Sequence, residues 1–280
     1  MSFRFVDAHL HCWDLRLMPY PWLATVPAIA SPHTPAELQA EAGPLQPERM
    51  VFVECGAPWL DEVRWIERLA ASDRRLGAIV ARCAVNEGAA TLAAIEELKK
   101  HPLVRGVRHL IQHEPDPSFC ARPEFIDGVQ ELGRAGLSFD LCCFPVQLPA
   151  VIRLVRACPG TRFVLDHLGK PGIRARRLDP WREQIRELAA FPHVVAKFSG
   201  LITEADHAAW KPDDLRPCVD QALATFGAGR LLFGGDWPVA KLAGSYPRWL
   251  EVARGLVSHL SAAEQDAVFW GNAVRFYRLN

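Results

Sequence analysis

The chain has 280 residues, 50% of them apolar, and it carries 32 basic and 32 acidic side chains. This length and composition can bury either one large core or two smaller ones. The balanced charge argues against nucleic acid or an anionic membrane surface as a partner, and no apolar run approaches the roughly 20 residues that span a bilayer. We therefore expect a small-molecule substrate, with no nucleic-acid and no membrane partner. A homo-oligomer is compatible with the sequence.

Compartment signals are the next feature of the sequence. The N-terminus has no basic segment followed by an apolar one, which predicts the absence of a secretory signal. The eight cysteines form no CxxC pair, and several lie inside apolar runs, which indicates reduced core thiols rather than a disulfide framework or a zinc cluster. Together these signals predict a cytoplasmic protein.

Short β-rich runs alternate with helical patterns along nearly the whole chain. Apolar residues recur at a spacing of three to four in residues 60–70, 92–98 and 151–155, as in helices that pack on one side. The predicted strands are Phe3–His9, Met50–Cys55, Leu76–Ala84, Val104–Leu110, Leu137–Cys143, Thr161–His167, Val194–Ser199 and Arg230–Asp236. Eight strands with intervening helices predict a (β/α)8 TIM barrel in a single domain over residues 1–280. A doubly wound open sheet is the alternative fold.

The two ends of the chain offer the residues best suited to chemistry. In the first strand, alternation places Asp7, His9 and His11 on one face, and Val6, Ala8 and Leu10 on the other. The eighth strand ends at Asp236, before Trp237 and Pro238. If the sheet closes, this carboxylate lies beside the two histidines, where it can orient and deprotonate a water molecule. A turn or helix-capping aspartate is the structural alternative.

A long, proline-rich connection follows the first strand over residues 12–49. It begins at the carboxyl end of the first strand, which is the end at which TIM-barrel enzymes hold their active sites. Long loops in compact domains are often lids or binding loops. We expect a lid-like loop in which Trp13 and Trp22 help to roof the site and bind substrate. The alternative, that these rings only plug the top of the barrel, remains open.

Further polar residues end the other predicted strands. Either Asp166 or His167 points inward from the sixth strand, and the alternation of side chains does not decide which. Lys197 lies in an otherwise apolar strand, so it must reach solvent or meet an anionic group. Taken singly, these residues suit salt bridges at the barrel mouth. Taken together, they predict a polar substrate-binding ring of Glu54, Arg82, Arg108, His109 and Lys197.

Six short motifs follow one another along the chain. They are Asp7-Ala8-His9-Leu10-His11, Pro21-Trp22, Arg108-His109-Leu110-Ile111-Gln112, Asp166-His167-Leu168-Gly169-Lys170-Pro171, Lys197-Phe198-Ser199-Gly200-Leu201 and Phe233-Gly234-Gly235-Asp236-Trp237-Pro238. In this order they resemble the amidohydrolase superfamily, and the likeness covers nearly the whole chain. Within the superfamily, the chain is similar to the amidohydrolase-related (amidohydrolase 2) branch of sugar-lactone and dicarboxylate-lactone hydrolases, in particular the L-fuconolactone and L-rhamnonolactone hydrolases.

The resemblance implies a barrel enzyme that hydrolyses a ring ester. It implies Asp236 and His167 as catalytic residues, with His9, His11 and Asp236 as the ligands of one divalent metal ion, zinc, when a metal is bound. One departure concerns the fifth strand, where metal-using members place a histidine or a carboxylated lysine. This chain offers only Asp140 or Cys142 there, and some relatives work without metal, so the need for a metal is left open.

We expect a lactonase that opens a sugar (aldono) lactone. Glu54 beside Arg82 and Arg108 suits a neutral polyol better than a dicarboxylate, which would require several inward arginines. The alternatives are a dicarboxylate or muconate-type lactone hydrolase, a metal-dependent decarboxylase of the same superfamily, and a binding barrel without catalysis.

Overall fold

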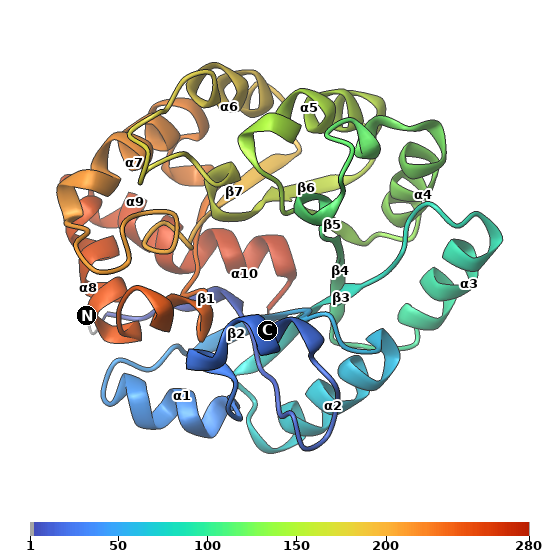
Figure 1. The fold of residues 1–280 in the computed structure, drawn as a ribbon, viewed down its shortest axis with the longest axis horizontal. Coiled ribbons are helices and arrows are strands. Elements are labelled where there is room, and N and C mark those ends of the chain that lie inside the picture. The colour runs from blue at the N-terminus through green and yellow to red at the C-terminus, as the bar shows by residue number, and fades with distance from the viewer. Residues whose placement is uncertain (1–2, 280) are drawn as a thin grey trace.

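Eight short parallel strands form a ring that is surrounded by helices. In Figure 1 the colour changes from blue to red around this ring, in the order of the chain. The computed structural model describes residues 3–279. The sheet runs in chain order from the first strand to the eighth. The strands are β1 (Val6–Leu10), β2 (Arg49–Val53), β3 (Leu76–Arg82), β4 (Val104–His109), β5 (Ser138–Leu141), β6 (Arg162–Leu165), β7 (Val194–Phe198) and β8 (Leu231–Phe233). Each predicted strand overlaps an observed one.

Backbone hydrogen bonds join the first strand to the segment that follows the last. The His11 N–H donates to the Trp237 carbonyl at 2.7 Å, and the Asp236 N–H donates to the His9 carbonyl at 2.7 Å. A parallel bridge between Leu10 and Trp237 lies at the same place. These contacts close the ring, which confirms the predicted (β/α)8 barrel.

Helices cover the outside of the ring (Figure 1). The three predicted helical stretches lie in the second, third and fifth helices. No helix of residues 3–279 is long and apolar enough to cross a membrane. The helices are α1 (Pro35–Ala42), α2 (Trp59–Ser72), α3 (Ala89–Leu98), α4 (Pro123–Arg134), α5 (Leu148–Ala157), α6 (Trp181–Ala189), α7 (Pro212–Phe226), α8 (Tyr246–Leu256), α9 (Ala262–Asp266) and α10 (Asn272–Tyr277).

The apolar core has two parts. The larger part fills the space between the strands and the surrounding helices. The smaller part fills the barrel interior, where small side chains suit the narrow space, and it includes Tyr277 of α10. Its strand residues are Val6, Ala8, Val51, Val53, Ala78, Val80, Val164 and Leu232.

The predicted alternation along β1 is wrong. Val6 and Ala8 belong to the barrel interior, whereas Asp7 contacts Tyr246 of α8, whose hydroxyl donates to Asp7 Oδ2 at 3.0 Å. The pairing of β1 with β2 shifts register between Asp7 and Leu10, and Asp7 Oδ1 accepts a hydrogen bond from the His9 N–H at 3.0 Å. Because an irregularity of this kind resets the alternation, His9 reaches the barrel interior together with Ala8.

The connection over residues 12–49 is folded, not a free loop. Two 3-10 turns and α1 lie within it, and Trp13 and His33 exchange two backbone hydrogen bonds of 2.8 Å. Glu41 of α1 accepts from the Trp237 indole at 2.9 Å and from the Tyr246 N–H at 3.1 Å. This connection is therefore fastened to the loop that follows β8.

We predict that Tyr246→Phe destabilises the barrel by about 1–3 kcal/mol, because it removes a hydrogen bond from the buried Asp7 carboxylate. Tyr20→Phe is the matched control, since the buried Tyr20 hydroxyl has no hydrogen-bond partner in the described chain. Urea unfolding of the two variants measures the difference. Equal losses of stability would contradict a special role for the contact between Tyr246 and Asp7.

Candidate active site

A cavity of about 630 Å³ opens where the carboxyl ends of the strands meet. This is the end of the barrel at which TIM-barrel enzymes hold their active sites. The loops after all eight strands contribute to its wall. Residues that the sequence predicted for the site and that line the cavity are His11, Trp22, Glu54, Arg82, Arg108, His109, His167 and Asp236.

Asp236 lies at the inner end of this cavity and is almost fully buried. Its Oδ1 is 3.5 Å from His11 Nε2 and 3.8 Å from His9 Nε2. Burial alone raises the pKa of Asp236, but the imidazoles of His167, His11 and His9 outweigh burial and hold this pKa well below its usual range. Asp236 is therefore an ionised carboxylate at neutral pH.

The orientation of His11 leaves a lone pair toward Asp236. His11 Nδ1 lies 2.8 Å from the Val53 carbonyl oxygen, which can only accept, so the ring proton is on Nδ1. In a neutral ring, Nε2 is then an acceptor, and it faces another acceptor, Asp236 Oδ1, at 3.5 Å. Two facing acceptors call for a shared cation, either a proton on Nε2 or a metal ion.

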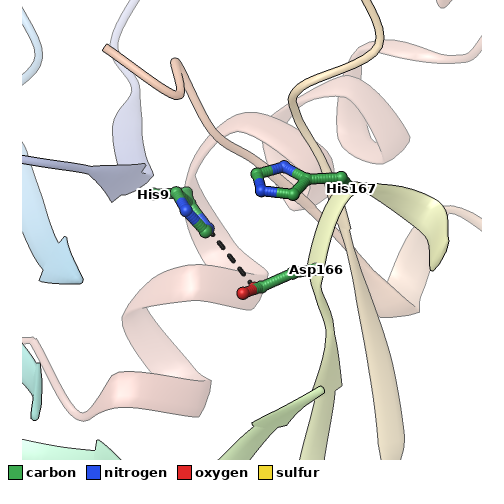
Figure 2. A group of neighbouring side chains, drawn as sticks. All are labelled: His9, Asp166 and His167. Carbon is green, nitrogen blue, oxygen red and sulfur yellow. Dashed lines mark ion pairs between the residues drawn. The ribbon is translucent and has the colours of Figure 1, made fainter. Parts of the chain in front are cut away.

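His9, Asp166 and His167 meet across the barrel mouth, as Figure 2 shows. His9 Nδ1 lies 3.3 Å from Asp166 Oδ1, and the rings of His9 and His167 are 4.5 Å apart. His167 and Leu168 adopt left-handed backbone conformations, with φ of 53° and 51°. Because the chain turns in this way, the consecutive Asp166 and His167 both face inward, which answers the question that alternation left open.

Asp166 is already paired with two buried cations. Its Oδ1 lies 3.0 Å from Lys197 Nζ, and its Oδ2 accepts from Arg108 Nη1 at 3.2 Å. Burial raises the pKa of Asp166, but Lys197 and His9 lower it well below its usual range. Asp166 therefore holds its neighbours in place and is poorly suited to bind a further ion.

The prediction that Lys197 and Trp13 bind substrate is corrected by the structure. Lys197 is fully buried and does not line the cavity, because Asp140 and Asp166 hold its ammonium beneath it. Trp13 is also fully buried, and its indole N–H is bound by the Ile29 and Ser31 carbonyls. The roof residue is Trp22, which lines the cavity and donates to the Cys55 carbonyl at 2.8 Å.

Most charges around the cavity are already paired. Arg108 donates from Nε to Glu54 Oε1 at 2.9 Å and from Nη2 to the Glu54 carbonyl at 2.7 Å. His109 Nε2 lies 2.7 Å from Glu114 Oε1. Arg82 differs, because it is exposed at the rim and its hydrogen bond to the Gly56 carbonyl is long, at 3.4 Å from Nη1.

Comparison with known proteins identifies the family. The family model described as Amidohydrolase matches residues 6–279. This chain belongs to the amidohydrolase family. An L-fucono-1,5-lactonase from Burkholderia multivorans is 37% identical over 288 residues, which cover 98% of this chain and 96% of that protein. An L-fucono-1,5-lactonase from Burkholderia ambifaria is 33% identical over 287 residues, which cover 100% of this chain and 97% of that protein.

Solved structures agree with this assignment. Crystal structures of an amidohydrolase from Burkholderia multivorans, one with bound zinc and one with bound HEPES, are each 34% identical to this chain. Each match covers 99% of this chain and 100% of the other, with TM-scores of 0.90 for the zinc form and 0.89 for the HEPES form. The whole barrel of this amidohydrolase, including its long first connection, therefore has close structural counterparts.

Among residues 3–279 of this amidohydrolase, two groups of side chains each bring three potential metal-ligand atoms within 4.8 Å of one another. One consists of His9, His11 and Asp236, and the other of His9, Asp166 and His167. The first group fits a metal ion better, because Asp166 already faces Lys197 and Arg108. Arg108 Nη1, 3.5 Å from His9 Nε2, places a competing positive charge beside the first group.

The fifth strand of this amidohydrolase supplies no further metal ligand. Asp140 is held by Lys197 below the cavity, and the Tyr277 hydroxyl donates to its Oδ2 at 3.3 Å. Cys142 lines the cavity, but burial raises the pKa of its thiol to about 12, so it stays protonated. Neither residue can serve as a metal ligand in place of the histidine or carboxylated lysine that the resemblance implies for this strand.

Sequence reasoning missed several residues of the cavity wall. Lys170 and Gln112 line the cavity. Both lie within the motifs that carry the family resemblance, but no function was predicted for either residue. The loop position of Thr203, beyond the seventh strand, gave no signal of any kind. The detectable signal was for Lys170, a lysine directly after the His167-Leu168-Gly169 segment at a barrel strand's carboxyl end.

We predict that Arg108→Met destabilises this amidohydrolase by about 3–5 kcal/mol, because it leaves the buried Glu54 and Asp166 carboxylates without their cation. Arg82→Met is the matched control and should unfold at the same urea concentration as the unmodified protein, since Arg82 is exposed. Equal destabilisation by both substitutions would show that the buried ion pairs of Arg108 add no more to stability than the exposed Arg82 does.

Proposed function

We propose that this amidohydrolase is a lactonase that opens the ring of a sugar (aldono) lactone by attack of a water molecule. The observation that carries the proposal is the buried Asp236 carboxylate, which faces His9 and His11 at the inner end of a cavity wide enough for a sugar ring. The L-fucono-1,5-lactonases, at 37% and 33% identity over nearly the whole chain, support the reaction class.

In the proposed mechanism, Asp236 takes a proton from water, and the water oxygen attacks the ester carbonyl carbon. A tetrahedral intermediate forms, and its collapse breaks the bond between the carbonyl carbon and the ring oxygen. Asp236 then returns its proton to that ring oxygen, which gives a hydroxy acid. The left-handed conformation of Asp236, with φ of 52°, turns its side chain toward the histidines.

His167 is proposed to stabilise the negative charge that develops on the carbonyl oxygen. Burial lowers the pKa of His167 to about 4, so its ring is neutral at pH 7. Its Nδ1 lies 2.9 Å from the Ser199 hydroxyl oxygen. With that hydroxyl donating to Nδ1, the Nε2–H faces the cavity as a hydrogen-bond donor to the oxyanion.

His9, His11 and Asp236 would hold a divalent metal ion, and zinc suits imidazole and carboxylate donors. When bound, the metal supplies polarisation of the ester carbonyl. A lactone is an activated ester, so Asp236 and His167 are proposed to support hydrolysis without it.

The pairing of charges favours a neutral polyol over a dicarboxylate. A dicarboxylate calls for several inward-facing arginines, but the Arg108 guanidinium is already engaged by Glu54 and Asp166, and Arg82 is exposed at the rim. Glu54, Arg82, Arg108, His109 and Trp22 are proposed to orient the hydroxyl groups of the sugar ring.

We predict that Asp236→Asn lowers kcat for lactone hydrolysis by roughly 10²- to 10⁴-fold, because the amide cannot take the proton from water. Asparagine tolerates the left-handed backbone at this position, so the variant should fold normally. Proton release from a panel of aldonolactones, followed with a pH indicator, measures the rate. Near-normal turnover would remove Asp236 from the mechanism.

The same assay with a chelator separates the base from the metal ligand. We expect wild-type hydrolysis to survive chelation and the Asp236→Asn defect to persist there. Activity that disappears with chelator and returns with zinc would instead favour a metal-dependent hydrolase.

We predict that His11→Ala weakens zinc binding by roughly tenfold or more, because it removes one of three converging ligands. Isothermal titration of the metal-depleted protein with zinc measures the affinity. His259→Ala is the control, since His259 is an exposed histidine. Zinc affinity that is unchanged in His11→Ala would exclude this set of ligands.

A further inference from the structure

Four consecutive residues after β6 have positive φ angles. His167, Leu168, Gly169 and Lys170 have φ of 53°, 51°, 72° and 51°. Only glycine adopts this conformation readily, so three non-glycine residues among these four indicate a segment that its surroundings hold in place. The outcome is that His167 and Lys170 both line the cavity.

The loop after β7 holds this turn from outside. Gly200 leaves room for the His167 ring, because a Cβ there would lie 2.4 Å from His167 Nδ1. Glu204 Oε1 accepts from Lys170 Nζ at 2.8 Å. The turn itself is closed by the Lys170 N–H, which donates to the His167 carbonyl at 2.9 Å.

Of the two largely buried cations that line the cavity, Lys170 and Arg108, Lys170 has fewer of its N–H donors engaged by the protein. Its side chain is 15% exposed, and it lies near the Phe144 ring, with Nζ 5.6 Å from the ring centroid. An ammonium has three N–H donors, and within residues 3–279 Glu204 is the acceptor found for Nζ. Arg108, by contrast, donates hydrogen bonds to Glu54 and Asp166 from all three of its guanidinium nitrogens.

Ring opening changes the charge of the bound molecule. A neutral ester becomes a hydroxy acid, which loses its proton to solvent and is then a carboxylate. That carboxylate forms beside Asp236, whose own negative charge repels it. A cation in the same cavity can offset this repulsion and bind the product carboxylate. If that cation is also paired with a carboxylate of the protein, the product is bound less tightly and can be released.

We propose, on the basis of the proposed lactonase function, that Lys170 binds the carboxylate of the ring-opened product and that Glu204 competes for the same ammonium. Lys170 then discriminates an anionic ligand from a neutral one of the same shape. Glu204 limits how tightly the product is retained. The pair sets product affinity, and through it product inhibition.

Calorimetric titration with an aldonate and with the corresponding alditol, which lacks the carboxylate, tests this without requiring turnover. We expect Lys170→Met to reduce the preference for aldonate over alditol at least tenfold, and Lys170→Arg to restore part of it. Glu204→Gln, which keeps an acceptor but removes the competing charge, should strengthen aldonate binding severalfold and raise product inhibition. Lys99→Met is the matched control, because it removes an exposed Lys–Glu pair at the C-terminal end of α3.

An unchanged aldonate preference in folded Lys170→Met or Glu204→Gln would overturn the proposal. So would an equal loss of aldonate and alditol affinity in Lys170→Met, which would indicate a structural role. If Lys170→Met fails to fold, Glu204→Gln decides alone. If Lys170→Met loses the aldonate preference but the wild-type protein hydrolyses no lactone, carboxylate binding by Lys170 stands and the proposed function is refuted.

Discussion

The site depends on the closure of the barrel between its first strand and the segment after its last. Two backbone hydrogen bonds, from His11 to Trp237 and from Asp236 to His9, bring together residues that lie more than 200 positions apart. Asp7 reinforces the closure, since its carboxylate also accepts from the Gly235 N–H at 2.7 Å. Position 235 must be glycine for this, because a Cβ there would lie 2.4 Å from Asp7 Oδ2.

A group of fully or nearly buried charges, partly in the cavity wall and partly below it, fixes the geometry of the histidines. The cations Lys197 and Arg108 face the carboxylates of Asp140, Asp166 and Glu54. Buried pairs of this kind add little net stability, because desolvation offsets their attraction. What they provide here is orientation, since Arg108 and Asp166 each contact one nitrogen of His9.

Much of the fold and part of the site could be predicted from the sequence. Strand and helix periodicities predicted all eight strands, and the position of Asp236 after an apolar run predicted its meeting with His9 and His11. The errors arose where local backbone departs from regularity. The irregular pairing of β1 reversed the faces of Val6 and Asp7, and the left-handed turn at His167 gave two inward residues where alternation allows one. Lys197 and Trp13 were misplaced because sequence alone does not reveal how deep a polar or aromatic side chain sits.

The fastening of α1 through Glu41 has a consequence for the position of the Asp236 carboxylate. Trp237 follows Asp236 directly, so the connection that roofs the cavity and the loop that carries the carboxylate are tied through one side chain. Lys241, 3.1 Å from Glu41, adds an ion pair to the same point. Because Trp237 and Asp236 are adjacent, a shift of α1 would also move the backbone that carries the carboxylate. The position of the proposed base therefore depends on the packing of a helix that lies outside the cavity.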